Sequence, residues 1–310
     1  MIRNPLPWPN GARCAVALTF DMDADSILHL AHHATADTRV AGMSALRYGP
    51  EVAMPRLLEM YRRHGIKQTF FLPGWCMERY PQAVEAVMKG GHEIAHHSYL
   101  HEHPNELKPE EERYWFERAL DVIVKMTGAK PKGYRAATYK FSRHTLDILL
   151  EHGFDYDASL FGDDVPYILR SAKGTKGDVV ELPSHYGLDD WPHYQVSRDF
   201  NYIMALKAPS QALQVFIDEF DAAWEHGGMW ISVWHPFLSG RLARAHAIDN
   251  LLEHMQRKGK VWFARLDEIA AHARAMMAQG KWQPRIDTLP YYDGPIPELG
   301  VAARGALVKP

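Results

Sequence analysis

Polar clusters suited to catalysis or metal binding recur along the chain, each directly after an apolar stretch. The first is Asp21-Met22-Asp23, which follows the apolar run at 13–20. Residues two apart on a strand point to the same face, so both carboxylates are expected to face one space. Two carboxylates so close favour either a cation between them or a raised pKa on one. An aspartate-rich loop start is the ordinary alternative.

The histidine-rich segment 92–103 offers two competing metal-ligand spacings. His92 and His96 fit the pattern H-E-x-x-H, which binds zinc in proteases when both imidazoles lie on one face of a helix. Two glycines precede this pattern and its context is that of a strand, so we reject the protease interpretation. His97 and His101, which follow the strand, can close on one ion instead. Scattered surface histidines are the weaker alternative, because four histidines fall within eight residues.

Three further clusters follow later strand patterns. Arg135 carries a permanent charge suited to orienting a carboxylate, and the backbone N–H of Thr138 is a candidate donor to a developing oxyanion. A structural salt bridge is an equally ordinary use of Arg135. The fourth cluster is Asp189-Asp190-Trp191. His235, in Trp-His-Pro, is placed to donate a proton, although a buried structural histidine is a rival interpretation.

Strand and helix patterns alternate along the chain. Strand patterns cover 13–20, 67–74, 92–98, 133–138, 154–160, 179–184, 229–236 and 261–266. Helical patterns cover 50–64, 77–89, 109–127, 142–152, 209–226, 241–258 and 267–279. Seven or eight such units predict a single α/β barrel domain over 1–310, with a core at about 10–280 and an extended tail at 281–310. In such barrels the chemistry lies at the carboxyl ends of the strands, where the polar clusters fall.

Composition narrows the class of protein. The chain has 310 residues, 46% of them hydrophobic, and a formal net charge of −3, which gives no reason to expect a nucleic-acid partner. Its two cysteines cannot build a disulfide framework or a thiolate cluster. The 18 histidines point weakly to metal or proton chemistry. No export signal or apolar run long enough for a membrane is evident, so we expect a cytoplasmic protein.

The motifs together resemble those of a known family. TFDMDAD, HHSYLHEHP, RAAT, DDW and WHP occur in this order at strand ends, as in the polysaccharide deacetylase family with its NodB-homology domain, which is similar to carbohydrate esterase family 4. The match covers about residues 10 to 270. It implies a distorted (β/α)7 barrel of the TIM-like type.

The resemblance implies roles at individual positions. Asp23, His97 and His101 match the metal triad of the family, which usually binds one zinc ion. Asp21 matches the catalytic base, and Arg135 matches the residue that orients it.

The remaining motifs match the residues that donate a proton and contact the substrate in the family. His235 resembles the general acid, and Asp190 or its neighbour Asp189 would tune it. Contacts to the substrate or to an oxyanion are implied for Thr138, Tyr139 and Trp191.

The departures from the family pattern concern the substrate. Met22 separates aspartates that are usually adjacent, and Ala136-Ala137 stand where proline and an aromatic are common. With no export signal, the motifs look closer to an intracellular branch that includes cyclic imide hydrolases, allantoinase-like proteins and peptidoglycan-deacetylase-like proteins, often tetrameric. We therefore predict a metal-dependent hydrolase of non-peptide amides that N-deacetylates an acetamido sugar or a peptidoglycan-type substrate. Ring opening of a cyclic imide or ureide is the alternative, and a non-catalytic metal- or carbohydrate-binding barrel is a third.

Two further expectations concern assembly and access. We expect a homo-oligomer, a tetramer or a dimer, with no nucleic-acid or membrane partner. Residues 25–49 show no clean periodicity and are long enough to cover the mouth of the barrel as a lid. A subunit contact or a mobile loop is the alternative.

Overall fold

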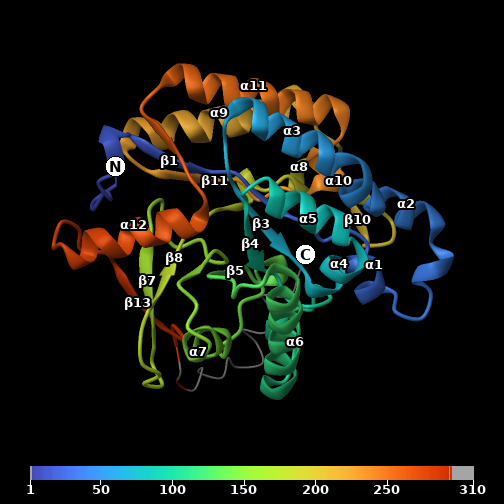
Figure 1. The fold of residues 1–310 in the computed structure, drawn as a ribbon, viewed down its shortest axis with the longest axis horizontal. Helices are drawn as coiled ribbons and strands as arrows, with labels where there is room; N and C mark the ends of the chain where they lie inside the picture. Colours follow the sequence, from blue (N-terminus) through green and yellow to red (C-terminus); the bar gives the residue numbers. More distant parts are fainter. Residues whose placement is uncertain (1, 293, 295–310) are drawn as a thin grey trace, which may run out of the picture.

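The chain forms a distorted α/β barrel whose strands run in parallel around a central core (Figure 1). The structure, a computed structural model, describes residues 2–292 and 294. The barrel strands are β1 (Cys14–Ala17), β2 (Thr19–Asp21), β3 (Thr69–Leu72), β4 (Glu93–His96), β5 (Gly133–Tyr134), β6 (Tyr156–Asp157), β8 (Val179–Glu181), β11 (Met229–Ile231) and β12 (Val261–Phe263). The strands outside the barrel wall are β7 (Tyr167–Ser171), β9 (Val196–Ser197), β10 (Tyr202–Ile203) and β13 (Ile286–Leu289).

The barrel closes by way of a strand that is broken at Leu18. One sheet runs in the order β13-β7-β8-β6-β5-β4-β3-β2, and a second places β1 between β11 and β12. Single parallel bridges, Phe20 to Trp234 and Asp189 to Val233, join the two sheets. β1 and β2 are buried throughout, as expected of parallel strands covered on both faces.

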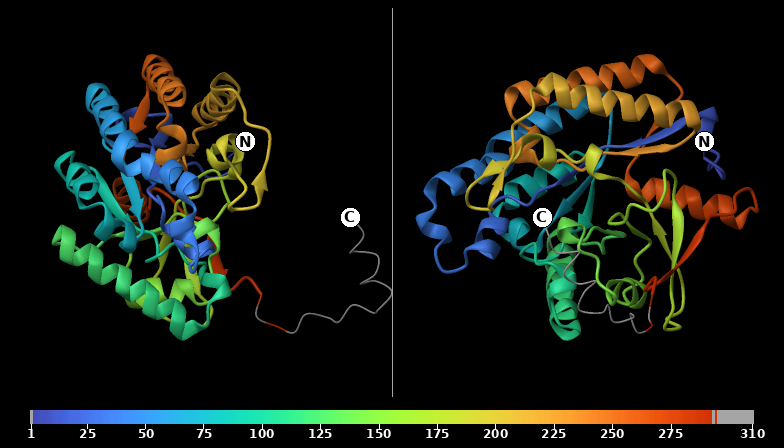
Figure 2. Two further views of the ribbon diagram at one scale, coloured as in Figure 1. Left: turned by 90° about the vertical axis from the view of Figure 1, so that its right-hand side faces the viewer. Right: turned by 180° about the vertical axis from the view of Figure 1, so that it is seen from behind.

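Helices cover most of the outside of the strands, whereas β7 and β13 lie at an edge of the molecule (Figures 1 and 2). The α-helices are α1 (Ser26–Ala31), α2 (Val40–Tyr48), α3 (Met54–His64), α4 (Gly74–Arg79), α5 (Pro81–Lys89), α6 (Pro109–Thr127), α7 (Thr145–Glu151), α8 (Trp191–Tyr194), α9 (Pro209–His226), α10 (Pro236–Ser239), α11 (Leu242–Lys258) and α12 (Leu266–Ala278). In the part of the chain that the structure describes, no helix is long and apolar enough to cross a membrane.

The long helices have clear sequence signals at their ends. α6 begins with Pro109 at its first turn, three glutamates follow, and Glu111 accepts a hydrogen bond from the backbone N–H of Lys108. Proline has no N–H to satisfy there, and acidic side chains interact favourably with the positive end of the helix dipole. The helix ends at Gly128, whose φ of 74° is costly for other residues. α9 has the same design, with Pro209 at its start and Gly227 after its end.

Three expectations differ from the structure. The predicted helix 77–89 is two helices, α4 and α5, which meet at Tyr80. Residues 25–49, which lack periodicity, contain α1 and α2. The tail expected from 281 onward is extended, but β13 within it pairs in parallel with β7, a strand that the sequence patterns did not indicate. Residues 293 and 295–310 of that tail lie outside the described part of the chain.

Candidate active site

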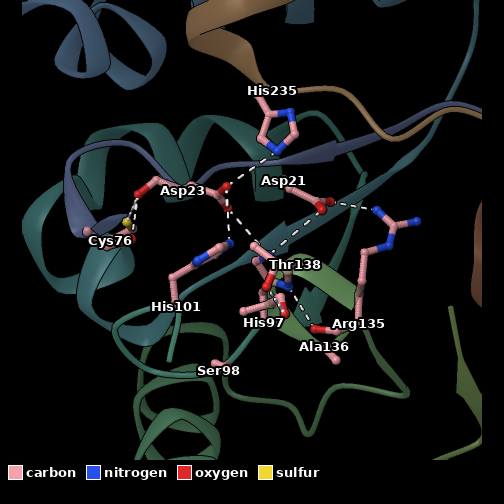
Figure 3. Close-up of polar contacts among 12 residues, drawn as sticks. Asp21, Asp23, Cys76, His97, Ser98, His101, Arg135, Ala136, Thr138 and His235 are labelled. Carbon is pink, nitrogen blue, oxygen red and sulfur yellow. Dashed lines mark hydrogen bonds and ion pairs between the residues drawn. The ribbon is translucent and has the colours of Figure 1, made fainter. Parts of the chain in front are cut away.

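Three side chains form a candidate metal site beyond the ends of β2 and β4. Nε2 of His97 lies 3.4 Å from Oδ1 of Asp23, and Nε2 of His101 lies 3.3 Å from Oδ2 of the same carboxylate (Figure 3). One donor atom from each residue falls within 4.8 Å of the others. Donors bound tetrahedrally to one zinc ion at about 2.0–2.1 Å are about 3.3 Å apart, so the spacing fits one ion.

Unsatisfied polar atoms in this trio also fit a cation. Asp23 Oδ1 and His97 Nε2 are buried and have no hydrogen-bond partner among the described residues. Buried polar atoms are normally paired or coordinate a metal. His97 donates its Nδ1–H to the carbonyl oxygen of Arg135 at 2.7 Å, which leaves Nε2 to face Asp23. This is the second contact expected of a metal-binding imidazole.

The charge around Asp23 is set by its histidines. Burial alone would raise the pKa of Asp23, but His101, His235 and His97 outweigh burial and hold the pKa well below its usual value. Burial lowers the pKa of His97, whereas Asp21 and Asp23 outweigh it and raise this pKa. The site is thus a negative centre that already attracts positive charge.

A strained loop carries His101 to the site. His101 adopts a φ of 65°, and Ser98 a φ of 62°, both in the left-handed region that is unfavourable for residues with a Cβ. The buried carboxylate of Glu102 accepts hydrogen bonds from the backbone N–H groups of Tyr99 and Leu100 at 2.7–3.2 Å. Glu102 therefore fixes the loop, a role that the sequence analysis missed although the residue stands beside His101.

The H-E-x-x-H pattern formed by His92 and His96 does not contribute to the candidate metal site. β4 covers 93–96, and the buried His96 faces away from Asp23, with Nε2 at 3.0 Å from the carbonyl oxygen of Phe116. The ring of His96 stacks on that of Phe116 at 4.3 Å. Burial lowers the pKa of His96 to about 3, so this imidazole is neutral.

Asp21 lies beside the metal site and is paired with Arg135. Nη1 of Arg135 donates to Oδ1 of Asp21 at 2.6 Å and to Oγ1 of Thr19 at 2.9 Å, while Nε donates to the carbonyl oxygen of Ala158 at 3.0 Å. The guanidinium is completely buried, and its Cζ lies 4.0 Å above the ring of Phe71. These contacts hold Asp21 in one orientation, with Oδ2 at 3.8 Å from Nε2 of His97.

His235 faces the metal site from the other side. Its Nε2 lies 3.4 Å from Oδ2 of Asp23, while its Nδ1 lies 2.6 Å from Oδ1 of Asp190. The backbone N–H of His235 also donates to Oδ2 of Asp190 at 2.9 Å. Burial lowers the pKa of His235, but Asp190 and then Asp23 outweigh burial and raise it well above its usual value.

The neighbouring Asp189 has a different partner. It accepts a hydrogen bond from the hydroxyl of Tyr139 at 2.5 Å and another from the backbone N–H of Trp191 at 2.7 Å. Burial raises the pKa of Asp189 to about 6. Of the two aspartates that the sequence left open, Asp190 is the one that contacts His235. The Trp191 ring lies 5.5 Å from the ring of His235.

The site opens into a large pocket. Its cavity volume is about 1000 Å³, in the range of pockets that take small molecules. Thr138 and Tyr139, with φ of 49° and 59°, lie on its wall. The candidate residues on the pocket surface are Asp21, Asp23, His97, His101, Thr138, Tyr139, Asp189, Trp191 and His235. Arg135 and Asp190 lie behind this surface.

Part of the pocket wall could not be predicted from motifs or periodicity in the sequence. Glu106, Leu107, Tyr186, Phe200 and Tyr202 line it, but they come from loops and short elements without periodicity. An aromatic-rich stretch at 186–202 is the only hint, and it does not tell a pocket wall from a core.

Comparison with known proteins agrees with this geometry. A family model described as polysaccharide deacetylase matches residues 43–156. A peptidoglycan deacetylase of Helicobacter pylori is 29% identical over an alignment of 248 positions, and the match covers 72% of this chain and 84% of that protein. The crystal structure of a putative polysaccharide deacetylase from Mycobacterium smegmatis is 37% identical with a TM-score of 0.86, and the match covers 96% of this chain and 99% of that one. The chain belongs to the polysaccharide deacetylase family.

Polysaccharide deacetylases are hydrolases that act on C–N bonds, so the chain is a member of an enzyme family. Its fold is shared more widely, because the structure of an allantoinase superposes with a TM-score of 0.77 at 22% identity, covering 90% of this chain and 95% of that one. At that identity the likeness concerns the fold alone.

Proposed function

We propose that this polysaccharide deacetylase family member is a metal-dependent hydrolase that removes the acetyl group from an acetamido sugar. The observation that carries the proposal is that a candidate base and a candidate acid both face the buried trio Asp23, His97 and His101. The base is Asp21, which is held by Arg135, and the acid is His235, which is held by Asp190. Amide hydrolysis needs a proton acceptor for water and a proton donor for the departing nitrogen. A divalent cation held by the trio, zinc by its donor set, would polarise the acetyl carbonyl and acidify a bound water.

Asp21 is proposed as the base. Its Oδ1 is held by Arg135, so Oδ2 is the oxygen directed toward the trio and able to take a proton from the attacking water. Because the guanidinium is buried and makes three hydrogen bonds, the carboxylate cannot swing away between turnovers. This fixed geometry suits general base catalysis, which typically contributes about 10²–10⁴-fold.

His235 is proposed as the acid. Its Nδ1 is engaged by Asp190, so Nε2 is the nitrogen that faces the reacting space and gives a proton to the amine. The raised pKa keeps the imidazole protonated near neutral pH, the state that a proton donor needs. An amide demands this step because its nitrogen leaves poorly as an anion.

The wall beside Asp21 is proposed to bind the substrate. Thr138 lines the same pocket with a left-handed backbone, and its N–H is the candidate donor to the oxyanion. The hydroxyl of Tyr139, oriented by Asp189, and the ring of Trp191 offer polar and apolar contacts to a sugar ring.

Ring opening of a cyclic imide or ureide is the second candidate. It uses the same base, acid and trio, and the observation that favours it is the set of aromatic side chains, Trp191, Phe200 and Tyr202, in the pocket wall. A binding protein without activity would need neither the Asp21–Arg135 pair nor the His235–Asp190 pair, so the third hypothesis has the least support.

A metal-reconstituted activity screen tests the proposal. The full chain is stripped with a chelator, reloaded with zinc, and assayed on N-acetylglucosamine and its oligomers against succinimide, hydantoin and allantoin. Release of acetate from the sugars supports the deacetylase, whereas turnover of the rings alone assigns the second candidate. No turnover of any of them by zinc-loaded protein would refute both.

A further inference from the structure

Two segments far apart in the sequence meet over the pocket. The first, the α1–α2 segment (residues 26–48), contributes Ile27, Leu30, Ala31 and His32 to the pocket wall. The second, the hairpin segment (residues 191–203), contributes Trp191, Pro192, Asp199, Phe200, Asn201 and Tyr202. Figure 2 shows the two segments side by side in the view from behind, as does Figure 1 near the labels α2 and β10.

Asp199 joins the two segments through both its side chain and its backbone. Nη1 of Arg39 donates to Oδ1 of Asp199 at 2.5 Å, and Nε2 of His32 lies 2.6 Å from the carbonyl oxygen of Asp199. The approach is close, since a Cβ on Gly42 would lie 2.6 Å from Oδ2 of Asp199. The α1–α2 segment therefore has a glycine where the carboxylate passes.

The hairpin segment is linked in turn to the proposed acid. The centroid of the Trp191 ring lies 6.0 Å from that of Phe200 and 6.1 Å from that of Tyr202. It also lies 5.5 Å from the ring centroid of His235 and 6.2 Å from that of Phe237. Movement of the hairpin segment would thus be transmitted to the wall beside the reacting groups. The α1–α2 segment is anchored separately, because Asp25 at its base accepts a hydrogen bond from the hydroxyl of Tyr80 at 2.5 Å.

We propose that Arg39 and Asp199 form a latch that closes the pocket and sets an upper limit on the size of the substrate. This inference rests on the proposed function for its choice of substrates. While the two segments stay joined, a polymer cannot leave the pocket between them, whereas a molecule of one or two rings fits within the cavity volume of about 1000 Å³. The chain then prefers a short acetamido sugar, or another small amide, to the interior of a glycan.

The exposure of the latch suits repeated opening. The side chains of Arg39 and Asp199 are 33% and 24% exposed, so water screens their attraction. Ion pairs of this kind shift an equilibrium about two- to fivefold rather than locking it. The latch therefore favours the closed pocket without preventing entry and release.

The first test measures size preference. Zinc-loaded wild-type protein and the variants Arg39→Ala, Asp199→Ala and their double mutant are assayed on N-acetylglucosamine and on its pentamer. We expect each single variant to raise the pentamer-to-monomer ratio of kcat/KM about two- to fivefold, and the double variant to add nothing. The matched control is Arg47→Ala, since Arg47 lies on α2, which begins directly after Arg39, and donates to Glu51 one turn away at 2.5 Å. That variant should leave the ratio unchanged.

The second test does not depend on activity. Amide hydrogen exchange is followed by mass spectrometry in residues 32–42 and 197–203 of the same zinc-loaded proteins. The latch predicts faster exchange in both segments for Arg39→Ala and no change for Arg47→Ala. Unchanged exchange and unchanged size preference in Arg39→Ala would overturn the latch while leaving the proposed function intact. Faster exchange in both segments, in a protein that hydrolyses none of the substrates, would support the latch and refute the proposed function.

Discussion

Replacing Asp21 by asparagine is expected to stop catalysis while leaving metal binding intact. The carboxamide keeps the shape of the side chain, and its Oδ1 can still accept the 2.6 Å hydrogen bond from Arg135. It cannot take a proton from water, so we expect kcat to fall about 10²–10⁴-fold. The three atoms of the candidate metal site belong to Asp23, His97 and His101 and are unchanged. Stoichiometric zinc should therefore remain.

The same substitution has a structural cost that can be estimated. It removes a charge that faces the buried guanidinium of Arg135, and hydrogen bonds to charged groups contribute about 1.5–3 kcal/mol against about 1 for neutral pairs. We therefore expect a loss of up to about 2 kcal/mol in unfolding free energy, and in a chain of 310 residues this lowers the melting temperature by up to roughly 3 °C. The variant stays folded at 25 °C, so its kinetics report the chemistry.

The assay pairs steady-state kinetics with metal content. Zinc bound per chain is measured by mass spectrometry for the wild type, Asp21→Asn and His97→Ala after identical reloading. His97→Ala should lose both zinc and activity, because it removes one of the three ligands. A kcat above a tenth of the wild-type value in Asp21→Asn, or a loss of zinc as large as that of His97→Ala, would refute the role of Asp21 as a base separate from the metal site.

Three further predictions concern pH, packing and the acid. Burial and then Asp267 raise the pKa of Glu93 to about 7, so between about pH 4.5 and 7 the folded protein holds a proton on Glu93 that the unfolded chain has released. The free energy of unfolding should therefore fall across this range and level off above it. In urea unfolding at pH 5 and 7.5, Glu93→Gln should remove about 3 kcal/mol of that fall. Gly133→Ala would place a Cβ 1.8 Å from the ring of Tyr156 and should cost about 3 kcal/mol or more in the same assay, so an unchanged midpoint would contradict the packing. Asp190→Asn removes the charge that raises the pKa of His235, so the alkaline limb of the pH profile of kcat/KM should move to lower pH by about one unit. If this limb does not move, His235 is not the acid that titrates there.

Local patterns were sufficient for the barrel frame. The bounds of α6 and α9 coincide with the helical patterns 109–127 and 209–226, because proline and glycine mark both ends of each helix. The positions of the barrel strands were also predicted from the sequence, but their lengths were not. Only Gly133–Tyr134 of the predicted strand 133–138 pairs in the sheet, since the chain turns at Thr138 to enter the pocket. The predicted oligomer and cytoplasmic location stay predictions.

Contacts between distant residues explain what the sequence could not reveal. Arg39 and Asp199 are 160 residues apart and meet only in the folded chain. The choice between Asp189 and Asp190 is similar, because both are acidic and adjacent. The bridge from Asp189 to Val233 fixes the register, and with it the residue whose carboxylate reaches His235.

The charges of the site explain why its residues are interdependent. Asp21, Asp23 and Asp190 are carboxylates in a buried space, and the positive groups paired with them are the guanidinium of Arg135 and the imidazole of His235. His97 and His101, which also face Asp23, must be neutral to bind a metal ion, and one negative charge is then left over on Asp23, whose Oδ1 has no hydrogen-bond partner within the described chain. A buried charge is stable only when it is paired or coordinates a metal. We therefore propose that a cation held by Asp23, His97 and His101 balances this charge, so that Asp21 can stay ionised while His235 stays protonated.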